Sequence, residues 1–118
     1  MTNNFIHSGN AITEGQARSG WFIGNFIPET EHLKHSKNVE VKWGIHPKGE
    51  TRTTGAPTGN ATTLSILIKG KYKVSLPDQE FILEKEGDYM MYQPNQLHTA
   101  EALEDSTILT IRWPSIGK

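Results

Sequence analysis

The side chains best suited to chemistry are a histidine and a tyrosine in the last third of the sequence, His98 and Tyr92. A neutral imidazole ionises near pH 7, so it can accept or donate a proton when a partner lies within hydrogen-bond reach. Tyr92 and Glu101 are the two candidates for that partner. We therefore predict acid–base chemistry at His98 and Tyr92 that needs no metal ion.

A second group of chemically capable side chains contains His46 and Glu50, which flank a Pro-Lys-Gly turn. If this turn folds toward His98, the three side chains form a set of two histidines and one carboxylate, which suits a divalent transition metal. Alternation along the strand, however, places His46 on the same face as Glu40 and Lys42, and we expect that face to be solvated. No cofactor is therefore predicted, and the metal site is kept as the alternative.

Length, charge and composition exclude several classes of function. The chain has 118 residues and a formal charge of -1, from 12 Lys and Arg against 13 Asp and Glu. No basic stripe of the kind that neutralises nucleic-acid phosphates is visible, so no nucleic-acid partner is expected. The sequence has no cysteine, which excludes disulfides, thiolate zinc sites and thiol nucleophiles.

The N-terminal region carries no targeting signal that the sequence makes visible. Residues 1–20 are rich in Asn, Ser, Gly and Thr and lack the apolar core of a secretory signal. No apolar run approaches the length of about 18 residues that a membrane helix needs. We predict a flexible tail over residues 1–20, one domain over residues 21–118, no membrane partner and a cytoplasmic location.

Short apolar runs between turn residues predict an all-β fold. The 11 glycines and 6 prolines fall between these runs, as is typical of strands and turns. A long loop over residues 51–61 is the expected wall or lid of any pocket. The pattern favours a closed jelly roll. Strands are expected at residues 21–28, 39–46, 62–69, around Tyr72 and Val74, and at residues 81–83, 89–93 and 107–113.

Alternation within these strands predicts which side chains face inward. The apolar face of residues 39–46, with Trp43 near its centre, is expected to be buried. Arg112 shares a face with Ile108 and Thr110, which directs its guanidinium toward the barrel wall or interior. A buried Arg requires a carboxylate. We expect Glu40 or Glu101 to supply it, with an anionic ligand as the alternative.

The stretch over residues 87–98 resembles the second motif of the cupin family, G-x5-P-x-G-x2-H. Gly87 and His98 hold the family spacing. Gln93 replaces the Pro of the motif and Asn95 replaces its Gly, which the turn tolerates because Asn accepts a left-handed conformation. The resemblance extends over residues 39–113 and implies a single-domain cupin-type jelly-roll β-barrel, or double-stranded β-helix, with His98 on its inner face.

The first cupin motif is only half present. Turns and a strand resemble its two ends, but residues 53–67 contain neither His nor Glu, where metal-dependent cupins carry two His and one Glu. Only His98 remains of the four ligands that hold iron, manganese or nickel in those cupins. The resemblance places Thr63 at the position of the missing Glu, so Thr63 and Ser65 are expected to form a neutral, hydrogen-bonding cavity wall.

The resulting prediction is a small cupin-domain protein that binds a small polar or carboxylated molecule in the barrel cavity, with acid–base isomerisation through His98 as its candidate reaction. One alternative is a non-catalytic binding or sensing module. The other is a metal-dependent oxygenase or isomerase that uses His46, Glu50 and His98. The sequence leaves turnover open. The predicted ligand-binding residues are Trp43, Arg52, Thr63, Ser65, Gln93 and Arg112.

The apolar run over residues 21–27 is the basis for a predicted subunit partner. A lone small barrel cannot bury such a run fully, and cupin relatives commonly pair through N-terminal strands. We therefore predict a homodimer that forms through this strand.

Overall fold

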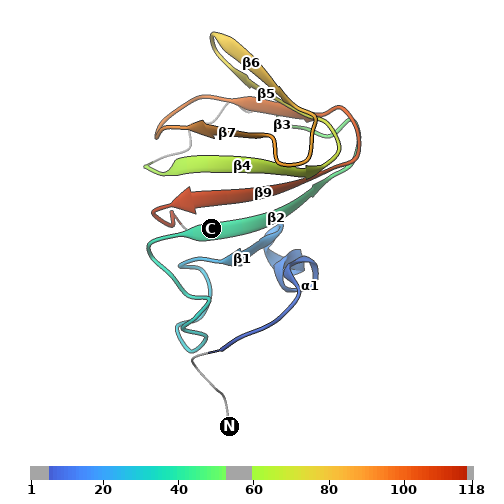
Figure 1. Cartoon of the computed structure of the whole chain (residues 1–118). Coiled ribbons are helices and arrows are strands. Elements are labelled where there is room, and N and C mark those ends of the chain that lie inside the picture. The colour runs from blue at the N-terminus through green and yellow to red at the C-terminus, as the bar shows by residue number, and fades with distance from the viewer. Residues whose placement is uncertain (1–5, 53–59, 117–118) are drawn as a thin grey trace.

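Strands dominate the structure, a computed structural model that describes residues 6–52 and 60–116 (Figure 1). The two short helical segments are α1 (Ala11–Gly15) and the 3-10 turn η1 (Gln16–Arg18). The strands are β1 (Trp21–Ile23), β2 (Glu40–His46), β3 (Thr51–Arg52), β4 (Thr62–Lys69), β5 (Tyr72–Leu76), β6 (Gln79–Leu83), β7 (Tyr89–Tyr92), β8 (Thr99–Ala102) and β9 (Ser106–Trp113).

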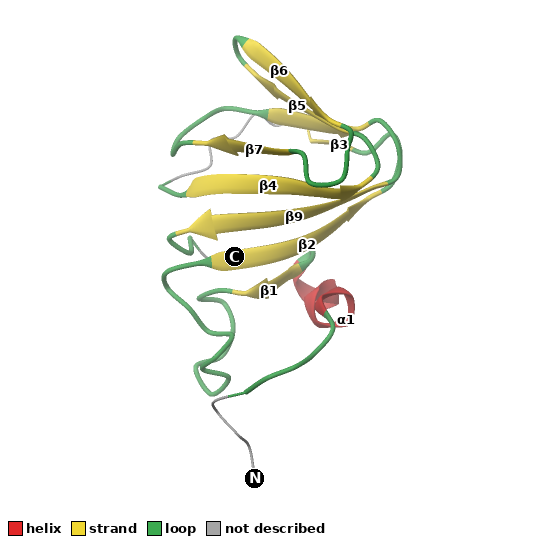
Figure 2. Ribbon diagram, in the orientation of Figure 1, coloured by secondary structure: helices red, strands yellow, loops and turns green. Residues whose placement is uncertain are grey.

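The strands form two antiparallel sheets (Figure 2). The five-stranded sheet has the order β1-β2-β9-β4-β7, and the four-stranded sheet has the order β3-β8-β5-β6. Neighbours in each sheet are mostly distant in the sequence, as in a jelly roll, where the chain passes repeatedly between the two sheets. The predicted all-β jelly-roll fold is confirmed.

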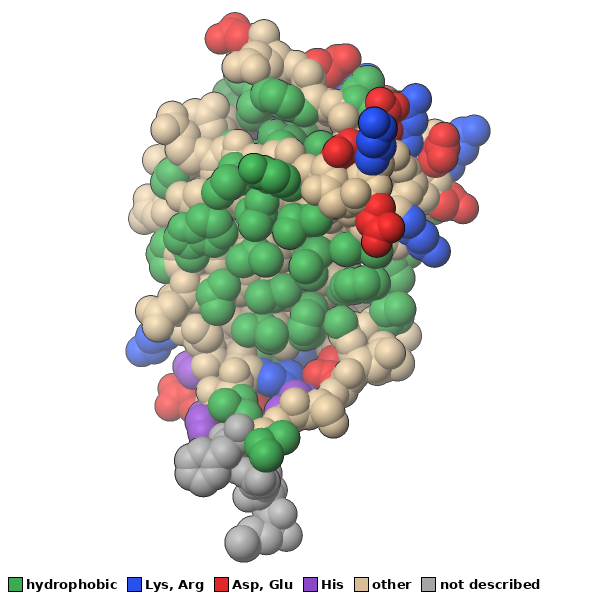
Figure 3. Space-filling view, in the orientation of Figure 1, with side chains coloured by type: hydrophobic (Ala, Val, Ile, Leu, Met, Phe, Trp, Pro, Cys, Tyr) green, Lys and Arg blue, Asp and Glu red, His purple; other side chains and the backbone are tan. Residues whose placement is uncertain are grey.

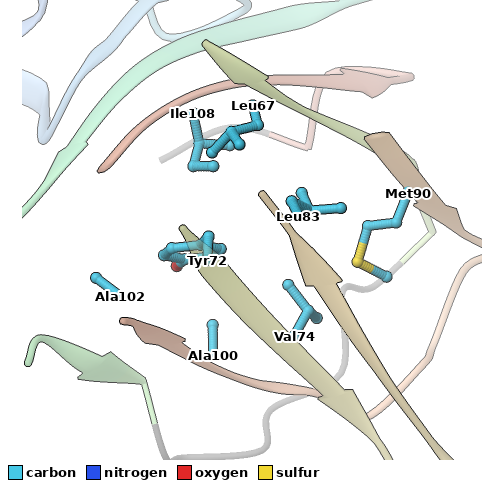
Figure 4. Packing of buried hydrophobic residues seen from close by; sticks show 8 residues of the cluster. All are labelled: Leu67, Tyr72, Val74, Leu83, Met90, Ala100, Ala102 and Ile108. Atoms are coloured by element: carbon cyan, nitrogen blue, oxygen red, sulfur yellow. The ribbon is translucent and has the colours of Figure 1, made fainter. Parts of the chain in front are cut away.

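An apolar core fills one part of the space between the sheets (Figure 4). Leu67 and Ile108 project from the five-stranded sheet toward Tyr72 and Val74 of the four-stranded sheet. Burial of these side chains is the main driving force that holds the sheets together. The remaining buried core residues are Leu83, Met90, Ala100 and Ala102.

A short helix occupies part of the segment predicted to be a tail. Asn10 caps α1, because its side-chain oxygen accepts hydrogen bonds from the backbone N–H groups of Ile12 and Thr13. The carboxylate of Glu14 accepts a hydrogen bond from the backbone N–H of Asn10 at 2.9 Å, so it also stabilises the start of the helix. The helix contacts β1 and β2. No helix within the described residues is long and apolar enough to cross a membrane.

The predicted long loop over residues 51–61 is described only at its ends. Thr51–Arg52 form β3, which pairs with β8, and the centre of the loop lies outside the described residues. β3 and β8 are too short and too polar for the sequence pattern to mark them as strands.

The orientation predicted for β2 is wrong. Glu40, Lys42 and His46 point into the barrel, whereas Ile45 on the opposite face is 57% exposed. The strand does alternate as predicted, but its polar face lines the interior. The polar side chains are accommodated there because Glu40 pairs with Arg112, Lys42 lies over the Trp21 ring and His46 contacts Glu50.

Candidate functional site

A row of polar side chains crosses the inner face of the five-stranded sheet. Glu40 on β2 lies opposite Arg112 on β9, Arg112 lies opposite Thr63 on β4, and Thr63 lies opposite Tyr92 on β7. Directly opposed residues on one face of a sheet have side chains in contact range. The register of four strands therefore assembles this row from four distant parts of the sequence.

The first pair in the row is a buried ion pair. Nη1 of Arg112 donates to Oε2 of Glu40 at 3.2 Å, and the Glu40 side chain is fully buried. Its other oxygen accepts hydrogen bonds from the Ser115 hydroxyl and the Ile116 backbone N–H, both at 2.8 Å. A buried carboxylate is stable when its lone pairs are satisfied in this way. The prediction that Arg112 pairs with Glu40 is confirmed, and Glu101 instead pairs with Lys73.

Trp21 on β1 carries two cations on its ring. The Arg112 guanidinium carbon lies 4.7 Å from the ring centroid, and Nζ of Lys42 lies 5.7 Å from it. Lys42 is the cross-strand partner of Trp21 in the β1–β2 pair. Both distances fall within the range of attractive cation–π contacts. The indole ring therefore attracts both positive charges at the wall of the interior. This attraction offsets part of the repulsion between them.

Two buried hydrogen-bonding atoms in this row lack a partner among the described residues. They are Nε of Arg112, which can only donate, and the Thr63 hydroxyl. Because a buried polar atom without a partner is costly, such atoms are usually satisfied by water or by a ligand. Arg112 and Thr63 are direct cross-strand neighbours. Of the two residues, Arg112 lines the interior cavity, whereas Thr63 is fully buried and is not among the residues that line it.

His98 and Tyr92 meet at the other end of the row. The Tyr92 hydroxyl lies 3.3 Å from Nε2 of His98, and the ring centroids are 4.8 Å apart. Nδ1 of His98 lies 3.4 Å from the Gln96 carbonyl, which can only accept. This contact favours the tautomer with the proton on Nδ1, so Nε2 accepts from the Tyr92 hydroxyl. The predicted catalytic pair is therefore in contact, and its third candidate member, Glu101, is engaged elsewhere.

Burial keeps both members of this pair neutral at physiological pH. Desolvation lowers the pKa of His98, and the positive charges of Arg112 and Arg52 lower it further, against the opposing effect of the Gln96 carbonyl. Desolvation also raises the pKa of Tyr92. A neutral imidazole hydrogen-bonded to a neutral phenol can move a proton in either direction.

The turn that carries His98 behaves as the motif resemblance predicts. Asn95 has a φ of 64°, in the left-handed region, at the position where the cupin motif has Gly. Gly87 at the start of the motif has a φ of 92°. Gln93, which was predicted to bind ligand, is exposed and does not line the interior cavity.

His46 and Glu50 form a second pair at the mouth of the barrel. Nδ1 of His46 lies 2.5 Å from Oε1 of Glu50, and the His46 side chain is 7% exposed. Its ring packs 5.1 Å from that of Tyr72. A Cβ at position 44 would stand 2.7 Å from Nε2 of His46, so the ring occupies space that only Gly44 leaves open. The expectation that His46 is solvated is therefore wrong.

The pKa of His46 reflects opposing influences. Desolvation lowers the pKa most, and the charges of Lys42 and Arg52 add to that effect, while the hydrogen bond to Glu50 raises it. A histidine whose orientation is fixed by a carboxylate is the arrangement used by general bases in many hydrolases.

The described residues do not fit a transition-metal site. Within residues 6–52 and 60–116, no group of three His, Asp or Glu side chains could hold one metal ion. His46 and Glu50 meet, but His98 is not grouped with them. Thr63, at the position where the resemblance expects a Glu ligand, is fully buried and does not line the interior cavity, which carries the cations Arg112 and Arg52.

The interior cavity is small and opens into wider hollows. Its volume is about 50 Å³, which is room for a few water molecules or for one polar group, since a water needs about 10–15 Å³. It is lined by both catalytic candidates, by Ser65 and by the cations Lys42, Arg52 and Arg112. One adjoining hollow of about 440 Å³ includes His46 and Glu50. Another of about 420 Å³ lies beside Trp21.

The hollow beside Trp21 is lined by cations. Arg18, Lys42, Arg52 and Arg112 contribute to its wall, and no Asp or Glu among the described residues does. Arg52 forms no ion pair with any described carboxylate. Arg18, Lys42 and Trp21 were not predicted to belong to the site. Only the strand pairing of β1 with β2 brings them to the cavity, although the alternation of Lys42 with Glu40 and His46 is visible in the sequence.

Trp43 is the remaining predicted ligand contact, and it lies on the opposite side of the sheet. It projects from the outer face of β2 and lines the hollow of about 440 Å³ that also includes His46 and Glu50. It therefore does not form the floor of the interior cavity.

No protein-family model matches the sequence, and no curated protein sequence matches it. Solved structures with a similar fold do match. KdgF from Halomonas sp. is 22% identical, with 68% of this chain and 73% of that chain covered and a TM-score of 0.59. A cupin superfamily protein from Desulfitobacterium hafniense is 20% identical, with 66% and 69% covered and a TM-score of 0.58.

A third similar structure is the DMSP lyase DddQ from Ruegeria pomeroyi, which is 12% identical, with 70% of this chain and 41% of that chain covered and a TM-score of 0.58. Such low identities carry information about architecture and not about activity. Together with the two sheets and the His98 turn, they show that this chain has the double-stranded β-helix fold of the cupin superfamily.

Proposed function

We propose that this protein binds a small carboxylated molecule at the polar end of its barrel, with one oxygen-bearing group beside Arg112 and Thr63. The observation that carries the proposal is the pair of adjacent buried atoms, Nε of Arg112 and the Thr63 hydroxyl, that lack partners among the described residues. A carboxylate accepts from both. A neutral alcohol would satisfy the geometry but not the charge.

The electrostatics of the opening favour an anion. Lys42, Arg52 and Arg112 line both the interior cavity and the hollow beside Trp21, and neither space is lined by a described Asp or Glu. Glu40 offsets part of the charge of Arg112, but Arg52 has no such partner in the described chain. Converging cations in a partly desolvated site attract anions more strongly than the same charges in water.

The candidate reaction is a proton transfer within the bound molecule. Nε2 of His98 can accept a proton from the carbon next to the carboxylate, and the Tyr92 hydroxyl can deliver a proton to a neighbouring atom, which gives an isomer with no net change in atoms or electrons. The cationic wall would stabilise the negative charge that develops on the substrate. A binding or sensing module without turnover uses the same cavity and is the second candidate.

A ligand panel tests the binding proposal. Thermal unfolding is measured with hydroxy and keto acids of three to six carbons and with their uncharged amides. At about ten times its dissociation constant, a ligand raises stability by about 1.4 kcal/mol, which is about 3–6 °C for a chain of this size. We expect a rise with acids alone, its loss in Arg52→Gln and its retention in Lys85→Gln. Equal rises with acids and amides would contradict the proposal.

Deuterium exchange separates turnover from binding. The acids that bind are incubated in D2O with the protein, and proton NMR follows the signal of the hydrogen next to the carboxylate. Exchange that depends on His98 supports acid–base catalysis, and His98→Gln should abolish it. Binding without exchange supports the module that holds its ligand unchanged.

A further inference from the structure

All three arginines of the chain line the hollow beside Trp21. Arg18 comes from η1, Arg52 from β3 and Arg112 from β9, so three distant segments of the sequence deliver them to one place. Lys42 adds a fourth cation to the wall. Clefts lined by charge of one sign concentrate the opposite charge, and a guanidinium can bind two oxygens of a carboxylate or phosphate at once. The hollow is therefore suited to an anion.

Elsewhere on the molecule, charges of opposite sign lie next to each other. On the face drawn in Figure 3, the Lys and Arg side chains at the upper right lie among Asp and Glu side chains. In the hollow, Glu40 pairs with Arg112, but no described Asp or Glu lines the wall itself. Arg18 and Arg52 form no ion pair with a carboxylate of residues 6–52 or 60–116. Two positive charges are thus available to a ligand.

Backbone contacts fix the segment that carries Arg18. The Gly20 N–H donates to the Gly15 carbonyl at 2.8 Å, and the Trp43 N–H donates to the Gly20 carbonyl at 3.0 Å. A side chain at position 15 would meet the Gly20 backbone at 2.6 Å, so this close approach requires glycine. The turn η1 is thereby attached to β2, and the half-buried Arg18 is held at the wall of the hollow.

The hollow adjoins the interior cavity. Trp21, Lys42, Arg52 and Arg112 line both spaces, whereas Arg18 lines the hollow and not the cavity. The cavity of about 50 Å³ has room for one polar group, and the hollow of about 420 Å³ has room for the remainder of a ligand. Trp21 begins the run that was expected to pair with a partner subunit. Within one chain it is 3% exposed and forms a wall shared by the two spaces.

We propose that the ligand is an elongated acid with an anionic group at each end. This inference rests on the proposed function, which places one carboxylate beside Arg112 in the interior. The second anionic group, a carboxylate or a phosphate, then lies in the hollow, where Arg18 and Arg52 bind it. A ligand with a single charge would leave these two arginines uncompensated in a partly desolvated space. Arg18 determines the preference for the second charge, because it lines the hollow alone.

Calorimetric titration of the whole chain tests the proposal with the dicarboxylates from succinate to pimelate. Each diacid is compared with its half-amide, which has the same length and one charge, and with its uncharged diamide. We expect the best diacid to bind about ten times more tightly than its half-amide, which is the effect of one charge-assisted hydrogen bond. Arg18→Gln should remove this advantage and leave the half-amide affinity unchanged.

Two further variants serve as controls. Arg18→Lys keeps the charge and should retain part of the diacid advantage. Lys85→Gln removes an exposed cation between β6 and β7 and should retain all of it. Unchanged binding of the half-amide shows that Arg18→Gln keeps its fold. A phosphonate in place of one carboxylate of the best diacid identifies the second group. Tighter binding of the phosphonate supports a phosphate, and tighter binding of the diacid supports a carboxylate.

The outcomes separate this inference from the proposed function. Half-amides that bind no better than diamides would overturn both. Half-amides that bind as tightly as diacids would overturn only the ligand with two charges, and so would a diacid advantage that Arg18→Gln leaves intact. An equal loss of affinity for diacid and half-amide in Arg18→Gln would also overturn it, because a single carboxylate would then occupy the hollow.

Discussion

His46 and Glu50 are joined at the mouth of the barrel by a contact of 2.5 Å between Nδ1 and Oε1. The turn between them brings the carboxylate back over the end of β2, where the imidazole is buried against Tyr72. The carboxylate is more exposed than the imidazole, so Glu50 links the interior to the solvent.

Removal of the Glu50 charge should lower the pKa of His46 further. The hydrogen bond and charge of Glu50 raise this pKa, against the larger effect of burial and the effect of the nearby cations. In Glu50→Gln the protonated imidazole loses its acceptor charge. NMR titration of the ring protons measures the change, and Glu80→Gln on β6 is the control. An unchanged or higher pKa would show that the contact is absent in solution.

Stability should fall as the solution becomes acidic through the range in which histidine ionises. The pKa values of His46 and His98 are both lower in the folded chain than the ordinary value near 6.5, so the unfolded chain binds protons first. The stabilising contribution is present above about pH 6.5 and is lost as the pH falls through the lower folded values. Thermal unfolding from pH 8 to pH 5 measures it.

The matched variants for this pH effect are His98→Gln and His32→Gln. The first removes a buried imidazole and should flatten the decline. The second removes an exposed one and should leave it unchanged. Equal declines in all three proteins would assign the effect to other groups.

Substitutions of Glu40 and Arg112 should have non-additive effects on the free energy of unfolding. Removal of one partner leaves the other as a buried charge, which costs about 3–5 kcal/mol. We expect Glu40→Gln and Arg112→Met each to destabilise by about this amount in urea unfolding. The double variant should be less destabilised than the sum of the two by about 1–3 kcal/mol. Additive effects would mean that the two side chains are not coupled.

A methyl group at position 44 should disturb His46 and little else. The added Cβ would lie 2.7 Å from Nε2 of His46, and overpacking of this kind costs about 1–3 kcal/mol. Gly44→Ala should therefore be destabilised, and His46→Ala in the same chain should relieve most of the clash. Calorimetry of the two single variants and the double variant provides the comparison. If the double variant were as destabilised as Gly44→Ala alone, the imidazole of His46 would not lie beside position 44.

The fold could be predicted from the sequence because turn residues and short apolar runs alternate at regular spacing. The His98 turn was accessible for a similar reason, since Asn95 was expected to replace a glycine and does adopt a positive φ of 64°. The alternation of Thr63 and Ser65 also predicted their place on the inner wall, where both are buried.

The rest of the site depends on information that one sequence does not contain. Alternation in residues 40–46 separates two faces but does not say which is inside, and the usual preference for an apolar interior gave the wrong answer. The cavity cations were missed because Trp21 meets Lys42 only through strand pairing. Trp43 was predicted to contact a ligand; it lies outside the interior cavity but lines the hollow that includes His46 and Glu50.

The bonds from Ser115 and Ile116 to Glu40 tie the last described residues to the buried ion pair. Here a deletion after Pro114 would strip the buried carboxylate of Glu40, the partner of Arg112, of two donors. In versions of this protein truncated after Pro114, the side chains of the interior cavity should therefore be arranged differently, even though every residue that lines the cavity is still present.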